Sequence, residues 1–309
     1  MEHVALITGA NGFVGRVLSS YLASRTWRVL ESVIPGVEST ADQFPCDVTS
    51  AEQVAQLMEW AAGVTHVFHL AAITFVPVSS AHPAETMAVN VLGTVNLLHA
   101  MLKHHPGARF VYVGSAAVYG IPQRLPVTED HPLAPREPYA ISKAAADAHC
   151  EYAARVLQAN VVRLRPFNHS GAGQSDRFVL SSFARQIVAI ERGAMPPVLR
   201  VGNLDASRDF LHVNDVVRAY ELAAQKGVRG AVYNVCSGRG TIIRDALDAL
   251  LRRAQISIEI ETDPERLRPS DIPEVWGSHE RLTDATGWRP ETPFETVLDD
   301  LLEYWRNRS

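Results

Sequence analysis

The sequence predicts an α/β fold: a Rossmann-type doubly wound parallel sheet with a smaller C-terminal domain. Two observations support this prediction. Short β-like runs alternate with helical patterns through the first half of the chain, and a glycine-rich turn follows the first run. This alternation is typical of βαβ units, whose parallel strands carry helices on both faces. With 309 residues, of which 47% are hydrophobic, the chain can bury a large core.

The expected elements follow from the local patterns in chain order. Strands are expected at residues 4–8, 28–33, 65–70, 109–114 and 160–165, and helices between them at 13–24, 51–61, 84–104 and 138–157. The sequence "SAEQ" at 50–53 has the form of a capping box, which starts the second of these helices. After Arg165 the pattern changes to loops with a helix near 176–192, then strand–helix–strand over 209–235, and a last helix near 293–306.

The composition argues against several classes of protein. Lys and Arg number 29 against 34 Asp and Glu, and this net charge of −5 disfavours nucleic acid or a membrane surface as the main partner. No apolar run reaches the roughly 18 residues of a membrane helix, and the start "MEHVALITGA" lacks the basic region of a signal peptide. Cys46, Cys150 and Cys236 are far apart with no CxxC pattern, so we expect a reduced, cytoplasmic protein.

The turn "TGANGFVG" (8–15) has the spacing of a dinucleotide-binding loop. Gly9, Gly12 and Gly15 lie directly after the first expected strand and at the start of a helix. Such a loop needs a tight turn and a close backbone approach to a pyrophosphate, whose charge the helix N-terminus favours. A plain tight turn is the competing interpretation, and the βαβ context favours the dinucleotide.

The residues leave the identity of the dinucleotide open. Glu31 lies near the end of the second strand, about where NAD proteins place a ribose-binding acid. A shift of one or two residues would put Val33 or Ile34 there instead, and no arginine follows to bind the 2′-phosphate of NADP. Asp47 in "CDVTS" either hydrogen-bonds the adenine or is a loop aspartate before a helix cap.

Tyr139 and Lys143 in "YAISK" share one helix face, one turn apart. Lysines number only three in this arginine-rich chain, and Lys143 follows Pro138 near a helix start, where the dipole does not favour a cation. An ammonium about 4 Å from a phenol contributes on the order of 4 kcal/mol at an effective dielectric constant of about 20. The spacing therefore predicts a proton-transferring Tyr139 whose pKa Lys143 lowers toward neutrality, with a chance pair as the competing interpretation.

Ser115 is the third candidate catalytic residue. It ends the expected strand 109–114 in "GSAAVYG", at the edge where parallel sheets bind their ligands. Its hydroxyl is placed to donate a hydrogen bond to a carbonyl oxygen while Tyr139 delivers a proton. A strand-end serine that satisfies its own loop is the competing interpretation.

Taken in order, "TGANGFVG", "HLAA" (69–72), "NVLGT" (90–94), Ser115 and "YAISK" resemble the extended short-chain dehydrogenases/reductases that act on nucleotide sugars. The resemblance covers essentially the whole chain. It implies that Ser115, Tyr139 and Lys143 are catalytic. It also implies a cofactor site formed by Gly9, Asn11, Gly12, Phe13, Val14, Gly15, Asp47, Val48, Leu70, Ala71, Ala72 and Asn90, together with Tyr139 and Lys143.

The second half is similar to GDP-4-keto-6-deoxy-D-mannose reductases. The matching stretches are "RPFNHSGAGQ" (165–174), "VGNLDASRDF" (201–210), "VYNVCSGRGT" (232–241) and "LRPSDIP" (267–273). The resemblance implies that the nucleotide sugar contacts Ser115, Asn168, Arg208, Arg268 and Asp271. Thr74 in "ITFVP" (73–77) is a further polar contact, with a structural loop threonine as the competing interpretation. Charge-assisted partners for a diphosphate are also what an acidic protein needs, although surface ion pairs are the competing interpretation for each arginine.

The change of pattern after Arg165 also predicts a division into domains. Dinucleotide binding falls to residues 1–165 with about 209–240, and the sugar nucleotide to a substrate domain made of 166–208 and 241–309. Dehydratases of the family carry an acid pair after the catalytic hydroxyl residue, where this chain has Ala116 and Ala117, so a dehydratase is not expected. No metal site is expected either, because the twelve histidines show no zinc-like ligand spacing.

The expected function is reduction of the 4-keto group of GDP-4-dehydro-6-deoxy-D-mannose to GDP-D-rhamnose, or to GDP-6-deoxy-D-talose. The resemblance favours NADP(H) without excluding NAD(H). A nucleotide-sugar 4-epimerase with tightly bound NAD uses the same triad and is the alternative, whereas a non-enzymatic dinucleotide sensor would need no triad. We expect a homodimer with a GDP-sugar substrate and with no nucleic-acid or membrane partner.

Overall fold

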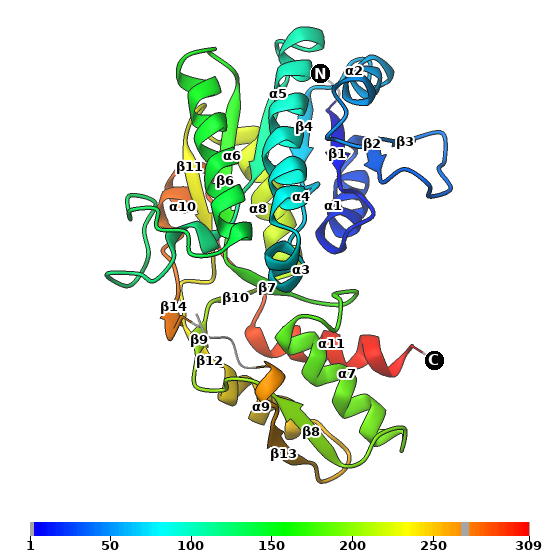
Figure 1. The fold of residues 1–309 in the computed structure, drawn as a ribbon, viewed down its shortest axis with the longest axis vertical. Coiled ribbons are helices and arrows are strands. Elements are labelled where there is room, and N and C mark those ends of the chain that lie inside the picture. Colours follow the sequence, from blue (N-terminus) through cyan, green and yellow to red (C-terminus); the bar gives the residue numbers. More distant parts are fainter. Residues whose placement is uncertain (1–2, 267–271, 309) are drawn as a thin grey trace.

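The structure is a computed structural model that describes residues 3–266 and 272–308. Its main sheet has seven parallel strands in the order β3-β2-β1-β4-β5-β6-β11 (Figure 1). The strands are β1 Val4–Thr8, β2 Arg28–Val33, β3 Gln43–Pro45, β4 His66–His69, β5 Arg109–Val113, β6 Val161–Pro166 and β11 Val232–Val235. The strand order reverses between β1 and β4, so the predicted doubly wound sheet is confirmed and its ligand crevice lies at that reversal.

Helices cover both faces of this sheet because the strands alternate their apolar side chains. In β1, Leu6 packs on one face, and Ala5 and Ile7 pack on the other. The Leu6 face is covered by α2 (Ala51–Trp60), α5 (Gly93–His104) and α6 (Pro138–Arg155). The opposite face is covered by α1 (Phe13–Ser24), α8 (Val213–Lys226) and α10 (Glu280–Thr286).

A separate hydrophobic cluster lies in the C-terminal part, at the bottom of Figure 1. It joins α7 (Val179–Glu191), α9 (Ile243–Leu251) and α11 (Phe294–Arg306) with the paired strands β8 (Val198–Val201) and β13 (Glu259–Thr262). These helices are amphipathic, and α11 buries one face through Val297, Leu298, Leu301 and Leu302. Residue range 241–309 is not confined to this cluster, since Leu282 and Trp288 pack on the main sheet beside α8.

Two small sheets connect the two parts. One has the order β12-β9-β14, with β12 Thr241–Ile242, β9 Ser207–Arg208 and β14 Glu274–Val275. The other pairs β10 (Phe210–His212) with β7 (Asn168–Ser170) in parallel. Asp209 is the only residue between β9 and β10, so these two sheets lie next to each other along the chain.

The expected helix over 84–104 is confirmed as an unbroken helical segment over 83–104, but the π turn within it and the separate α3 before it were not expected. The structure has α3 (Val76–Ala81), α4 (Pro83–Met87), a π-helical turn η1 (Ala88–Leu92) and then α5. The π turn is stabilised by buried contacts of Asn90, which local periodicity does not reveal. The sequence patterns also missed β3, β8, β13 and α9, while the described chain adds two 3-10 turns, η2 (Ala116–Tyr119) and η3 (Pro264–Arg266).

The capping box is present in altered form. Ser50 caps α2 by accepting a hydrogen bond from the Gln53 amide, but the Gln53 side chain accepts from the Asp47 amide instead of from Ser50. Across residues 3–266 and 272–308, no helix combines the length and the apolar composition that crossing a membrane requires.

Candidate active site

The glycine loop closes the end of β1 onto the start of α1. Gly9 has φ +69°, and a Cβ there would lie 2.8 Å from the Ala71 amide nitrogen. Gly15 faces the Gly9 carbonyl so closely that a Cβ would overlap it. Gly12 is the N-cap of α1, and Asn11, Phe13 and Val14 complete the turn that presents the helix N-terminus to the crevice.

The segment after β4 forms the other side of this loop. The Leu70 amide donates to the Thr8 carbonyl at 3.2 Å, and the Ala71 amide donates to the Thr8 hydroxyl at 3.2 Å. Leu70, Ala71 and the following Ala72 therefore border the crevice between β1 and β4. Thr74, two residues farther, is exposed on the loop before α3.

Asn90 is 1% exposed, and its amide is committed to protein partners. Its side-chain oxygen accepts from the Ile73 amide at 2.8 Å, and its NH₂ group donates to the Ile73 carbonyl at 3.0 Å and to the Ser142 hydroxyl at 2.9 Å. The Ser142 hydroxyl in turn donates to the Tyr139 carbonyl. Asn90 thus links the loop after β4 to the start of α6. Its side chain positions these two segments, since its amide group is bound to the protein.

Ser115 and Tyr139 lie together at the carboxyl edge of the sheet. Ser115 follows β5 and caps η2, with its hydroxyl accepting from the Ala117 amide at 3.2 Å. Tyr139 is on the first turn of α6, directly after Pro138, and its phenol is close enough to the Ser115 hydroxyl for Ser115 to lower the phenol pKa. The two hydroxyls could therefore hold the same carbonyl oxygen.

Lys143 lies one turn farther along α6 and is 4% exposed. Its Nζ donates to the Val113 carbonyl at 2.8 Å and lies 5.4 Å from the centre of the Tyr112 ring. Burial lowers the pKa of Lys143 to about 8. The side chain is therefore a buried cation near neutral pH, between β5 and the helix of Tyr139.

The expected lowering of the Tyr139 pKa is wrong for this structure. Burial raises the pKa of Tyr139 to about 12; the hydrogen bond with Ser115 lowers it and the charge of Glu137 raises it further. Removal of the phenol from water is the largest of these effects, and the Lys143 Nζ is held at the Val113 carbonyl. Tyr139 is consequently protonated at neutral pH.

The adenosine end of the crevice differs from a typical NAD site. Glu31 lies two residues before the end of β2 and pairs with Ile7 of β1. Its carboxylate accepts from the Gln43 side chain at 2.7 Å. The exposed Ile34 follows β2 instead. Asp47 uses one carboxylate oxygen to accept from the Thr49 amide and hydroxyl, as a loop aspartate does.

The adjacent Val48 is buried against α5. A Cβ on Gly93 would lie 2.6 Å from the Val48 side chain, so glycine is needed for this close approach. Val48 therefore positions the loop before α2 relative to α5, on the crevice side of the sheet.

The structure brings Asn168 and Arg208 onto neighbouring short strands. Asn168 is exposed in β7 and lies opposite Phe210 of β10, and Arg208 is in β9, two residues before Phe210. Arg208 donates to the Ser207 carbonyl at 2.8 Å. Arg268 and Asp271 lie outside the described residues.

Sequence reasoning missed His169, although the stretch "RPFNHSGAGQ" contains it. Its Nδ1 donates to the Phe167 carbonyl at 2.9 Å, and burial lowers its pKa, so the ring is neutral. The ring lies nearly parallel to that of Phe13, with centroids 6.4 Å apart. Strand β7 therefore lies next to the glycine loop through this ring contact.

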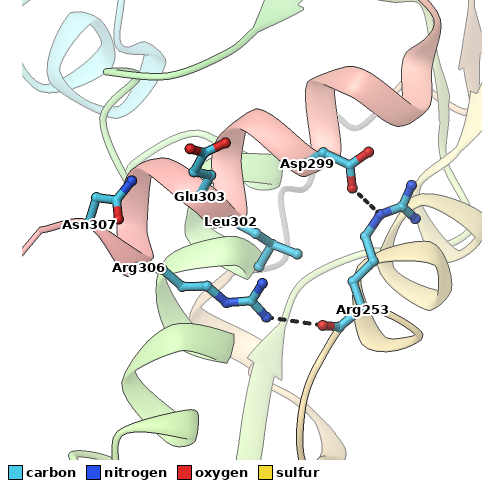
Figure 2. A pocket seen from close by; sticks show the side chains of 6 residues that line it. All are labelled: Arg253, Asp299, Leu302, Glu303, Arg306 and Asn307. Atoms are coloured by element: carbon cyan, nitrogen blue, oxygen red, sulfur yellow. Dashed lines mark hydrogen bonds and ion pairs between the residues drawn. The ribbon is translucent and has the colours of Figure 1, made fainter.

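No other part of the described chain offers comparable chemistry. Over residues 3–266 and 272–308, no three His, Cys, Asp or Glu side chains gather in a way that could hold a metal ion. Figure 2 shows a surface hollow lined by residues of α11 and by Arg253, in which Arg253 bonds Asp299 at 2.6 Å and Arg306 donates to the Arg253 carbonyl at 3.0 Å. These polar groups satisfy one another, so the hollow anchors α11 and carries no reactive group.

Comparisons with known proteins agree with this geometry. The sequence pattern of the GDP-mannose 4,6 dehydratase family matches residues 6–301. The GDP-6-deoxy-D-mannose reductase of Pseudomonas aeruginosa is 40% identical and covers 100% of this chain and 99% of its own length. The GDP-6-deoxy-D-talose 4-dehydrogenase of Aggregatibacter actinomycetemcomitans is 29% identical over 98% of this chain and 97% of its own. RMD from Pseudomonas aeruginosa, solved in complex with NADPH, has a TM-score of 0.89 and 38% identity over 99% of this chain and 100% of its own.

Proposed function

Because the chain belongs to the GDP-mannose 4,6 dehydratase family of extended short-chain dehydrogenases/reductases, we propose that it reduces the 4-keto group of GDP-4-dehydro-6-deoxy-D-mannose with NADPH. The proposed product is GDP-D-rhamnose, which is GDP-6-deoxy-D-mannose. The observation that carries the proposal is the meeting of Ser115, a protonated Tyr139 and the buried Lys143 at the crevice next to the glycine loop.

The residues present fit a dinucleotide cofactor. The N-terminus of α1 has no acidic residue in its first turn, and the glycines leave room for a pyrophosphate close to the backbone. Bound there, the reduced nicotinamide would supply a hydride. At the β2 end, the Glu31 carboxylate is engaged with Gln43, so it does not face a 2′-phosphate at the strand end, and NADPH is favoured.

The protonation states support the reductive direction. A reductase must start with a phenol that carries a proton, and a Tyr139 pKa of about 12 ensures this at neutral pH. Ser115 donates a hydrogen bond to the substrate oxygen, which becomes an oxyanion as C4 is reduced. Tyr139 then gives its proton to that oxygen, and the Lys143 ammonium stabilises the resulting phenolate.

The same turn disfavours dehydration. Removal of water from C4–C6 needs a carboxylic acid beside the hydroxyl residue, but Ala116 and Ala117 occupy the turn after Ser115. The family therefore supplies the scaffold and the sugar-nucleotide class, while the local residues support a reductase.

We also propose which parts of the chain bind the dinucleotide and the sugar nucleotide. Residues 1–165 with about 209–240 bind the dinucleotide, and 166–208 with 241–309 bind the sugar nucleotide, supported by the separate α7–α9–α11 cluster. A homodimer is supported by the exposed apolar side chains of Leu92 at the end of η1, Ile141 in α6 and Val156 directly after α6. The free cysteines support a cytoplasmic location.

Redox balance tests the proposed reaction. A reductase consumes one reduced cofactor per turnover, whereas an epimerase returns its cofactor to the starting state. With GDP-4-dehydro-6-deoxy-D-mannose and NADPH, we expect nicotinamide absorbance to fall in step with the substrate, and more slowly with NADH. Flat absorbance together with interconversion of GDP- or UDP-hexoses at C4 without added cofactor would establish the epimerase instead. NMR of the product distinguishes the rhamno from the talo configuration.

A further inference from the structure

Asp209 occupies the junction between the two small sheets. It is 1% exposed and separates β9, which carries Arg208, from β10, whose Phe210 lies opposite Asn168 in β7. Asp209 therefore sets how β9, which carries the proposed diphosphate ligand Arg208, is placed relative to the β7–β10 pair, which carries the proposed sugar-nucleotide contact Asn168.

The Asp209 carboxylate is saturated by donors from two other segments. Oδ1 accepts from the Ser237 amide at 2.7 Å and from the Ser237 hydroxyl at 2.7 Å. Oδ2 accepts from the Gly238 amide at 3.1 Å and from the Gly277 amide at 3.3 Å. The Asp209 amide also donates to the Val275 carbonyl at 3.1 Å.

These bonds connect the small sheet to the main one. Ser237 and Gly238 follow β11, the last strand of the main sheet, and Gly277 follows β14, the partner of β9. Strands β9, β12 and β14 each have two residues, too few to hold a sheet by backbone pairing alone. Hydrogen bonds to an ionised acceptor are roughly twice as strong as neutral ones, so this carboxylate is suited to hold the junction.

We propose that Asp209 is a positioning residue of the nucleotide-diphosphate site, which holds Arg208 at a fixed place relative to the main sheet. The inference rests on the proposed function, in which Arg208 binds the diphosphate of the GDP-sugar. Burial raises the pKa of Asp209 to about 6, so the carboxylate is ionised at pH 7.5, where binding is measured.

The test is a double-mutant cycle on nucleotide binding at pH 7.5. Asp209→Asn keeps the shape of the side chain but turns an NH₂ group toward the amides of Gly238 or Ser237, which are themselves donors. Calorimetry with GDP, and competition with guanosine, are measured on the wild type, Asp209→Asn, Arg208→Ala and the double variant. We expect Asp209→Asn to weaken GDP binding about tenfold, guanosine binding less than about twofold, and the double variant to bind GDP no more weakly than Arg208→Ala.

Glu129→Gln is the matched control, because Glu129 is also a buried carboxylate that accepts from a backbone amide, that of Asn234 at 2.8 Å. It should lower the melting temperature without changing GDP affinity. Equal weakening of GDP and guanosine by Asp209→Asn, or additive losses in the cycle, would overturn the inference. Absence of GDP binding by the wild type would instead refute the proposed function.

A milder variant covers the case in which Asp209→Asn does not fold. Ser237→Ala removes the hydroxyl donor to Oδ1, together with longer contacts of that hydroxyl to the Arg239 backbone, and leaves the Ser237 amide bond to Asp209 intact. It should weaken GDP binding by about two- to fivefold and leave NADPH affinity unchanged. Unaltered GDP affinity in Ser237→Ala would count against the role of Asp209.

Discussion

The Nζ atom of Lys143 lies 2.8 Å from the carbonyl oxygen of Val113, the last residue of β5. This bond holds a buried cation against the strand that leads to Ser115, one helical turn from Tyr139. A lysine at that place costs stability, since burial disfavours its charge, and its retention is explained by the site rather than by the core.

Lys143→Met should therefore stabilise the fold while abolishing turnover. The folded pKa of about 8 lies below the unfolded value of 10.5, so the unfolded chain binds this proton more tightly. Burial of the charged Lys143 therefore lowers the free energy of unfolding by on the order of 3 kcal/mol below pH 8, and this loss of stability disappears as pH rises from 8 to 10.5. Urea unfolding should show the variant more stable than the wild type at pH 7, with a smaller difference at pH 10. A variant less stable at pH 7 would contradict this reading of Lys143.

Tyr139→Phe should remove most of kcat, by about 10²- to 10⁴-fold, because the proton delivered to the substrate oxygen is lost. The affinities for NADPH and GDP should change by less than about twofold, as measured by calorimetry. Tyr152, exposed on the same helix, gives the matched control, and Tyr152→Phe should keep wild-type activity. If Tyr139→Phe retains most of the rate, another group is the acid.

Asn90→Ala should lower both stability and kcat. It leaves the Ile73 amide and carbonyl and the Ser142 hydroxyl without their partner, at a cost of at least about 2 kcal/mol in the free energy of unfolding. Turnover should fall more than GDP affinity, because the first turn of α6 loses its link to the crevice. Asn96→Ala, which removes bonds to the Val48 and Thr49 carbonyls, should reduce stability only. Similar kcat losses in both variants would show that Asn90 has no special link to the active site.

The three loop glycines should respond differently to alanine. Gly15→Ala should destabilise the protein strongly, since the added Cβ would overlap the Gly9 carbonyl. In Gly12→Ala the Cβ would lie 3.1 Å from the same oxygen, at φ −73°, so the fold should tolerate it. Its effect should appear in NADPH affinity, because in the proposed cofactor site Gly12 lies next to the pyrophosphate. Thermal unfolding and calorimetry separate the two results, and unchanged NADPH affinity in Gly12→Ala would exclude this position from the cofactor site.

The sequence predicted the main sheet well because its signals are local. The strand at 4–8 is a short apolar run before a glycine turn, and the structure has β1 with the same bounds. The helix of Tyr139 and Lys143 begins at Pro138, which is favoured at a first turn, and this residue starts α6. The spacing also predicted that Tyr139 and Lys143 share a face.

Features that depend on distant contacts were not predictable. The π turn at 88–92 is held by Asn90 reaching Ile73 and Ser142, which no local period encodes. The direction of the Tyr139 pKa depends on how much water the fold excludes, and the charge argument from "YAISK" underestimated that cost. Asp209 escaped notice because its donors are backbone amides far along the chain.

The place of β11 at the edge of the main sheet also matters for the order in which the chain is made. β6 pairs with β5 on one side and with β11 on the other, yet β11 follows only after α7, β8 and α8. All six residues of β6 are buried in the final fold. Until β11 has been synthesised, one edge of β6 in the nascent chain therefore has no partner strand. Such edges recruit other strands. Truncation before Val232 should thus yield insoluble aggregates on expression, and slowing synthesis between Pro166 and Val232 should lower the yield of soluble enzyme.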